Sequence, residues 1–228
     1  MMRLAVAAFA LLALGCHSSA TDAAKPELYL LTSLPLLFDE DFAPGPAKGA
    51  AATWLREHYR VKAIDLPSQL PPGTTLLAAQ PRAIPAEELV ALDSWVRAGG
   101  KMLLLADPML EWPSKRPLGD RLRPPLAYAD TGLLAHWGLR LDAPDRRGAR
   151  QGAFGNFSIA YLSPGTLVQV GGDCDLSSDG SVAGCRLGRG HVTIVADADL
   201  LNVEASSDSS NNLPAVGAEL LKLSARPK

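Results

Sequence analysis

Polar side chains follow four apolar runs of the sequence that have the length of buried strands. They are Ser33, Arg82, Asp107, Asp197 and Asp199. In a doubly wound α/β sheet, ligands bind beyond the carboxyl ends of the strands, where such side chains meet. These five residues are therefore the predicted ligand-binding site.

The three aspartates among them have two interpretations. Their carboxylates could hold a divalent ion or accept hydrogen bonds from the hydroxyls of a sugar. Alternatively, each aspartate caps the turn or helix after its strand by accepting a backbone hydrogen bond, which is the commoner role of aspartate at a strand end. We expect the protein to need neither a metal nor a cofactor.

Nucleophilic catalysis requires a serine or cysteine at a sharp strand-to-helix turn, with a histidine in reach. The turn after the apolar run 74–79 reads Gln80-Pro81-Arg82 and offers no nucleophile. The sequence also contains no Gly-x-Ser-x-Gly motif, no metalloprotease helix motif and no glycine-rich phosphate or dinucleotide loop. We therefore predict that the protein is not an enzyme.

Cys174 and Cys185 are predicted to form a disulfide. They lie eleven positions apart, and the turn signal Asp179-Gly180 stands midway between them, as a hairpin requires. An oxidising compartment would let the two thiols pair. Metal ligation is the alternative, but two cysteines without paired histidines supply too few ligands.

The N-terminus has the layout of a secretory signal. One positive charge, Arg3, precedes an apolar run over residues 4–14, which is too short to span a membrane. Residues 12–16, Leu-Ala-Leu-Gly-Cys, resemble the bacterial lipoprotein signal, in which the cysteine receives a lipid and becomes the first mature residue. We predict a signal peptide over 1–15, lipidation of Cys16 and a tether over 16–26. Ordinary secretion and a buried N-terminal helix are the alternatives.

The lipid would hold the protein on the periplasmic side of the bacterial cell envelope, attached to a membrane through Cys16 alone. Without the lipid, the protein would be soluble in the periplasm. The formal net charge of -2 leaves no general basic surface to neutralise phosphates, so nucleic acid is not an expected partner.

Residues 27–228 are predicted to form one α/β domain, because 47% hydrophobic residues suffice for one medium-sized core. Apolar runs predict strands over residues 27–32, 61–65, 74–79 and 101–107. Amphipathic patterns predict helices after the first and third runs, so the sheet should be mainly parallel and wound on both sides. A late antiparallel β-hairpin should carry the two cysteines. We expect residues 108–125 to be a long ordered excursion and residues 143–156 an exposed loop.

Two blocks of the sequence resemble the gliding-motility type auxiliary components of ABC transport systems. Residues 84–108 are similar to that family's helix, glycine pair, strand and Asp-Pro, and residues 188–202 to its late strand with an Asp-x-Asp-x-x-Asn ending. The resemblance implies a flavodoxin-like sheet of the class I glutamine amidotransferase type, without the catalytic triad. It also implies a non-enzymatic domain that associates with a permease and an ATPase, or binds a ligand for them. A lipid on Cys16 would replace the family's membrane anchor.

The leading hypothesis is a non-enzymatic envelope lipoprotein that serves as an accessory or ligand-binding module of an ABC-type transport system. The alternative is a secreted hydrolase or carbohydrate-active enzyme that uses Asp107, Asp197 and Asp199. A purely structural envelope protein is a third hypothesis. Alanine substitution of the aspartates should abolish the activity of an enzyme, whereas a module should keep its partner.

Overall fold

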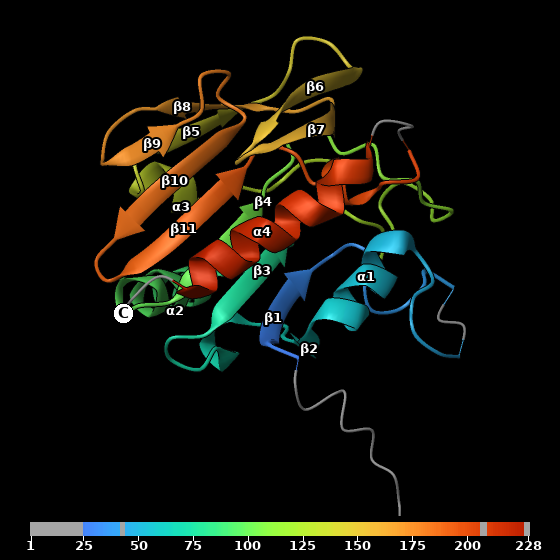
Figure 1. The fold of residues 1–228 in the computed structure, drawn as a ribbon, viewed down its shortest axis with the longest axis horizontal. Coiled ribbons are helices and arrows are strands. Elements are labelled where there is room, and N and C mark those ends of the chain that lie inside the picture. The colour runs from blue at the N-terminus through green and yellow to red at the C-terminus, as the bar shows by residue number, and fades with distance from the viewer. Residues whose placement is uncertain (1–24, 42–43, 206–208, 226–228) are drawn as a thin grey trace, which may run out of the picture.

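The computed structural model describes residues 25–41, 44–205 and 209–225. It is a mixed α/β fold built on a sheet of seven strands (Figure 1). In spatial order these strands are β2 (Arg60–Ala63), β1 (Glu27–Thr32), β3 (Thr75–Ala79), β4 (Lys101–Leu105), β11 (Gly190–Val195), β10 (Val182–Leu187) and β9 (Cys174–Leu176). The strands from β2 to β11 are parallel to one another, and β10 and β9 continue the sheet in antiparallel fashion.

The central strands β3 and β4 are buried at every position. Their sequences, Thr-Leu-Leu-Ala-Ala and Lys-Met-Leu-Leu-Leu, are nearly continuous apolar runs, as expected for parallel strands that are covered on both faces. Successive side chains point to opposite faces, so Leu77 of β3 enters one core and Leu76 the other. The sheet is therefore wound on both sides, as predicted.

Two helices cover each face of the sheet. On the near face in Figure 1 lie α1 (Ala50–His58) and α4 (Asn212–Ala225), which pack Leu55 and Leu220 against it. On the far face α2 (Ala86–Arg97) and the short α3 (Leu133–His136) supply Val96 and Leu134. Among the described residues there are also three single-turn 3-10 helices: η1 (Pro67–Gln69), η2 (Asp199–Leu201) and η3 (Ser209–Asn211).

The start and the end of α2 can be explained from its own sequence. Pro85 is the N-cap, and Glu87 and Glu88 occupy the first turn, where their charges offset the positive end of the helix dipole. The helix stops before Gly99, whose φ of 110° lies in the left-handed region that glycine adopts without strain. Only Ala98, Gly99 and Gly100 lie between α2 and β4, so a short turn joins the helix to the strand.

The prediction that residues 143–156 form an exposed loop is wrong. This segment contains β6 (Ala149–Phe154), which pairs with β7 (Phe157–Leu162) as a separate two-stranded antiparallel sheet. Ala149, Arg150, Gln151 and Ala153 of β6 are exposed, so the composition of this segment alone does not indicate a strand. The buried side chains of Ile159 and Tyr161, two positions apart in β7, supply the apolar face. A further pair joins β5 (Leu139–Asp142) to β8 (Thr166–Gln169).

The disulfide predicted between Cys174 and Cys185 is present. The two residues face each other in register across β9 and β10, with their Cα atoms 4.3 Å apart. Gly180 turns the chain between the strands with a φ of 69°. The late antiparallel hairpin of the prediction is thus confirmed.

Cys16, the signal peptide over 1–15 and most of the tether over 16–26 lie outside the described residues. Within the described ranges, no helix is both long enough and apolar enough to cross a membrane. Residues 108–125 form the long excursion that was predicted, without helix or strand.

Candidate functional site

The carboxyl edge of the sheet separates the five predicted site residues into two groups. Asp107, Asp197 and Asp199 come together beyond the ends of β4 and β11, which are neighbouring parallel strands. Ser33 and Arg82 line an open crevice beyond β1 and β3. The prediction that these residues share one edge is correct, but they do not form one site.

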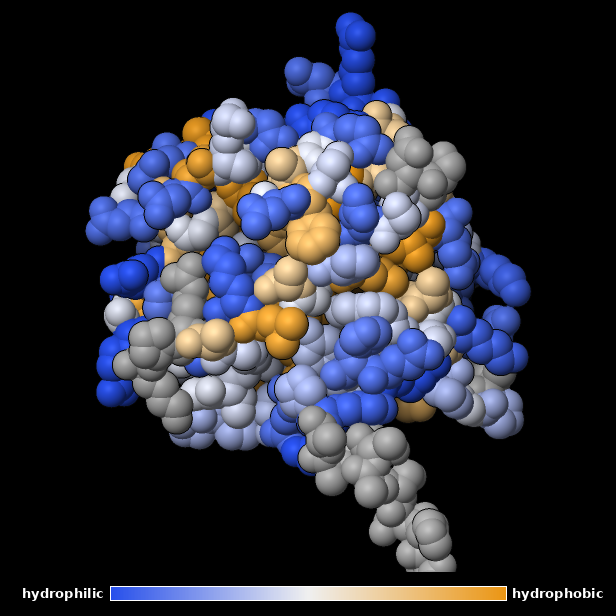
Figure 2. All heavy atoms as spheres, viewed as in Figure 1, coloured by the Kyte–Doolittle hydropathy of each residue, from blue (hydrophilic) through white to orange (hydrophobic). Residues whose placement is uncertain are grey.

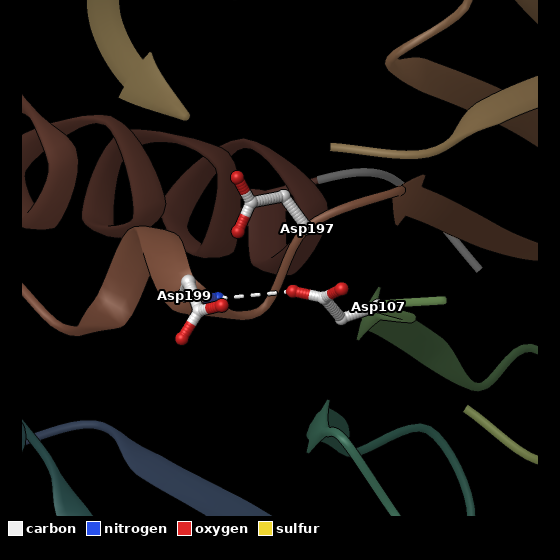
Figure 3. A group of neighbouring side chains, drawn as sticks. All are labelled: Asp107, Asp197 and Asp199. Carbon is white, nitrogen blue, oxygen red and sulfur yellow. Dashed lines mark hydrogen bonds between the residues drawn. The ribbon is translucent and has the colours of Figure 1, made fainter. Parts of the chain in front are cut away.

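The three carboxyl groups of Asp107, Asp197 and Asp199, which we call the aspartate cluster, lie close to one another (Figure 3). One carboxylate oxygen from each residue lies within 4.8 Å of those of the other two. The exposed fractions of the three residues are 0%, 0% and 3%. The three side chains therefore face the interior of the protein and not solvent.

Asp107 holds the backbone that follows both strands. Its Oδ1 accepts a hydrogen bond from the Met109 amide at 2.8 Å, two residues further along the chain. Its Oδ2 accepts from the amides of Ala198 at 3.0 Å and Asp199 at 3.4 Å. The carboxylate therefore joins the turn after β4 to the turn after β11.

The other two aspartates have the same kind of role. Asp197 accepts a hydrogen bond from the Leu162 amide at 2.7 Å, which fixes the end of β7. It accepts another from the Leu200 amide at 2.9 Å, within the single turn of η2. Asp199 Oδ2 accepts the amide of Glu111 at 2.6 Å. Asp199 Oδ1 is buried without a hydrogen-bond partner among the described residues. Backbone amides thus bond five of the six carboxylate oxygens: the bonds to Met109 and Leu200 are local, as in the predicted capping role, and the others come from distant segments.

Burial raises the pKa of each carboxyl group in the cluster, because the charged form loses its hydration. The pKa of Asp107 rises to about 6 and that of Asp199 to about 7. The pKa of Asp197 lies well above its usual range, through burial first and then through the nearby charge of Asp107. Near neutral pH the cluster therefore retains protons. A cation could bind there only by sharing oxygens that already accept backbone hydrogen bonds, Asp199 Oδ1 excepted.

The second group faces solvent in a crevice of about 340 Å³. Ser33 donates its hydroxyl to the backbone oxygen of Gln80 at 2.5 Å, and the exposed Arg82 donates to the backbone oxygen of Arg123 at 3.0 Å. β1 and β3 are neighbours in the sheet, but the chain runs from β1 outward to β2 and from β3 in the opposite direction to β4. This is a topological switch point, where open α/β sheets bind ligands.

Gln80 is a residue at this edge whose role sequence reasoning missed. It is fully buried directly after β3 and has a φ of 45°, which is uncommon for a residue with a side chain. Its side-chain amide donates to the backbone oxygens of Asp107 at 3.0 Å and Pro125 at 3.3 Å, and it accepts the Asp107 amide at 2.9 Å. The sequence shows the absence of a nucleophile here, but it carries no signal for these long-range bonds.

The family described as Domain of unknown function (DUF4350) matches residues 43–211, which include the aspartate cluster and Gln80. The chain belongs to the DUF4350 family. No curated protein matches the sequence of this DUF4350 chain.

Solved structures share the fold of this DUF4350 chain. The exo-β-1,4-mannosidase Op5Man5 from Opitutaceae bacterium strain TAV5 superposes with a TM-score of 0.54 and 15% identity, over 90% of this chain and 37% of the mannosidase. A catalytic mutant of Gan42B, a GH42 β-galactosidase from G. stearothermophilus, superposes with a TM-score of 0.50 and 16% identity, over 89% of this chain and 30% of the galactosidase. The cytoplasmic protein STM1381 from Salmonella typhimurium LT2 superposes with a TM-score of 0.50 and 12% identity, over 87% of this chain and 99% of STM1381.

This chain thus spans about a third of the length of the two glycosidases and nearly the whole of STM1381. At these identities the similarity concerns the fold.

Proposed function

We propose that this protein is a non-enzymatic envelope lipoprotein that serves as an accessory or ligand-binding module of an ABC-type transport system. Its domain would be a catalytically degenerate form of the flavodoxin-like class I glutamine amidotransferase fold. The permease and the ATPase of the transporter would be its partners, and the lipid on Cys16 its membrane attachment. A soluble periplasmic protein is the form expected if Cys16 is not lipidated.

The observation that carries this proposal is that Gln80, at the turn after β3, is buried and hydrogen-bonded to the backbone. Enzymes that use a nucleophile on such a sheet place it on a strained strand-to-helix turn, so that the reactive atom is exposed. Here the turn after β3 has the unusual backbone, with a φ of 45°, but it carries a buried amide whose oxygen and nitrogen both bond to the backbone of Asp107. Of the groups that bond Gln80, none is a histidine. The turn supports a role without nucleophilic chemistry.

The order of the parallel strands supports the fold assignment. From β2 through β1, β3 and β4 to β11, it follows the 2-1-3-4-5 order of flavodoxin-like sheets when only these five strands are numbered. The crevice with Ser33 and Arg82 lies at the switch point of that order and remains open to solvent. A ligand or a partner segment could bind there without any rearrangement of the sheet.

The hydrolase hypothesis requires Asp107, Asp197 and Asp199 to contact a substrate. The aspartate cluster is buried, and its oxygens accept backbone hydrogen bonds. This geometry favours a structural role of the three residues over catalysis.

Affinity purification tests the proposal. The chain would be expressed at native level with a C-terminal tag, cross-linked in cells, extracted in a mild detergent and compared with Cys16→Ala and with Ser19→Ala as a neighbouring control. We expect a permease and an ATPase with the wild type and with Ser19→Ala, and much less of both with Cys16→Ala. Mass spectrometry of the N-terminal peptide should find the lipid on Cys16.

Recovery of neither transporter subunit with the wild type would contradict the transport role. Hydrolysis of a glycoside substrate that is lost in Asp197→Asn would instead support the enzyme hypothesis.

A further inference from the structure

The near face of the sheet is not covered over its antiparallel part. α1 and α4 lie over the parallel strands, whereas no helix of the described chain lies over β9 and β10 on this side (Figure 1). The residues at the surface there are mainly hydrophilic (Figure 2). A groove of about 230 Å³ runs between α4 and β9 over this part of the sheet. We call it the sheet-face groove.

Three residues in register form the floor of the sheet-face groove. Asp175 of β9 is opposite Gly184 of β10, and Gly184 is opposite Thr193 of β11. A Cβ atom at Gly184 would meet no other atom within 4 Å, so the glycine leaves open space in the middle of the row. Glycine inside a strand commonly marks a place where a ligand approaches the backbone closely.

Charged side chains of both signs surround this floor. Glu219 of α4 is 5% exposed and accepts the Thr193 hydroxyl at 2.6 Å and the Lys222 ammonium at 2.9 Å. Asp175 lies across Gly184 from Thr193, and Arg186 follows Gly184 two positions further along β10. Both side chains are exposed and form no hydrogen bond or ion pair with any described side chain. Carboxylate acceptors therefore stand on both sides of the open floor, and cationic donors stand next to them.

An adjoining depression of about 420 Å³ extends the sheet-face groove toward the β6–β7 turn. The two share Phe154, Gly155, Glu219 and Lys222. Asn156 and the half-buried ring of Phe157 line the extension. A ligand longer than one unit could thus pass from the polar floor to an aromatic surface.

We propose that the sheet-face groove binds a neutral oligosaccharide. Each sugar hydroxyl both donates and accepts hydrogen bonds, so it uses the carboxylates and the cationic groups together, and the apolar face of a sugar ring packs on an aromatic ring such as Phe157. Mixed charges do not select a simple anion or cation. A peptide that extends the sheet needs the free backbone groups of an edge strand, and the floor here is the face of paired strands.

Calorimetric titration of the full chain tests this site, in a detergent without a sugar headgroup. The probes are maltotriose, cellotriose, mannotriose and chitotriose, with trialanine as a peptide of similar length. We expect at least one trisaccharide to bind. Gly184→Val fills the open space without backbone strain, because this glycine has no positive φ, and should weaken that binding by about tenfold or more. Asp175→Asn, at an exposed position, should also weaken it.

Asp145→Asn is the matched control, since Asp145 is an exposed aspartate outside the groove, and it should leave the affinity unchanged. The proposal is overturned if no trisaccharide binds, if trialanine binds in their place, or if neither groove variant alters the affinity. The titration needs no transporter subunit. Its result is therefore independent of whether the proposed transport role is correct.

Discussion

The side chain of Gln80 and the backbone of Asp107 exchange two hydrogen bonds. The Gln80 amide nitrogen donates to the Asp107 oxygen at 3.0 Å, and the Gln80 amide oxygen accepts from the Asp107 nitrogen at 2.9 Å. The last regular pair of β3 and β4 is Ala79 with Leu105. A side chain therefore continues the ladder between the two strands beyond the point where the backbone of β3 turns away.

Gln80→Ala should lower the free energy of unfolding by about 3 kcal/mol, because it leaves the buried amide of Asp107 without a partner and removes one hydrogen bond each from the oxygens of Asp107 and Pro125. Urea unfolding followed by circular dichroism measures the change. Gln80→Gly removes the same bonds but relaxes the backbone at a φ of 45°. It should therefore be more stable than Gln80→Ala by about 1 kcal/mol. Equal stability of Gln80→Ala and wild type would show that the bonds contribute nothing.

The protein should become less stable as the pH rises from about 4 to about 8. Asp199 has a folded-state pKa of about 7, raised by burial, against the ordinary 3.8 of an unfolded chain, and Asp107 is raised to about 6. In this pH range the folded state binds more protons than the unfolded state. The stabilisation is therefore complete below the unfolded-state pKa of each carboxyl group and is lost as the pH rises through its folded-state pKa.

Asp199→Asn should remove part of this dependence and raise the free energy of unfolding at pH 8 by about 1–3 kcal/mol, with little gain at pH 5. Urea midpoints at the two pH values measure it. Asp145→Asn, at an exposed position, serves as the control and should leave the difference between the two midpoints as in wild type. An unchanged difference in Asp199→Asn would contradict the raised pKa of Asp199.

Reduction of the disulfide between Cys174 and Cys185 should cost about 2–3 kcal/mol, since it closes a short loop of the unfolded chain. Urea unfolding with and without dithiothreitol should show this loss in wild type. The double variant Cys174→Ala/Cys185→Ala should be insensitive to the reductant. Identical midpoints for oxidised and reduced wild type would indicate that the bond does not constrain β9 and β10.

Gly190 and Gly184 form a matched pair of glycines in neighbouring strands. A Cβ atom at Gly190 would lie 1.9 Å from the backbone oxygen of Val96, whereas a Cβ at Gly184 would meet nothing within 4 Å. Gly190→Ala should therefore destabilise the fold by about 3 kcal/mol, and Gly184→Ala should change stability by less than about 0.5 kcal/mol. Thermal unfolding of the two variants provides the comparison. A similar midpoint for both would mean that α2 can move away from β11.

Local sequence patterns predict the parallel half of the fold well. The buried runs of β1, β3 and β4 and the capping signals of α2 are contained in a few adjacent residues, so they can be found without tertiary information. The strand β6 could not be predicted in this way. Its sequence, Ala-Arg-Gln-Gly-Ala-Phe, is exposed along most of its length and becomes a strand because β7 pairs with it.

The sequence indicates the edge of the sheet at which the candidate site lies, but not the burial or the hydrogen bonds of its side chains. Strand ends put Asp107, Asp197 and Asp199 at one edge, and the adjacency of β4 and β11 brings them together. The burial of the cluster depends on the amides of Leu162 and Glu111, which come from distant segments. Asn212, the first residue of α4, gives a similar case, because its side chain bonds the backbone of Ala160 and Leu200. Such long-range partners leave no local signature.

The parallel pairing of β4 with β11 constrains how this chain can fold. Lys101 is paired with His191, and the sheet between them cannot close until the chain from β5 to β10 has been synthesised. Loop closure of this length slows folding, because its entropy is lost before the contacts of the central strands form. If the N-terminus directs export, as proposed, this delay would keep the nascent chain unfolded and competent to cross a membrane.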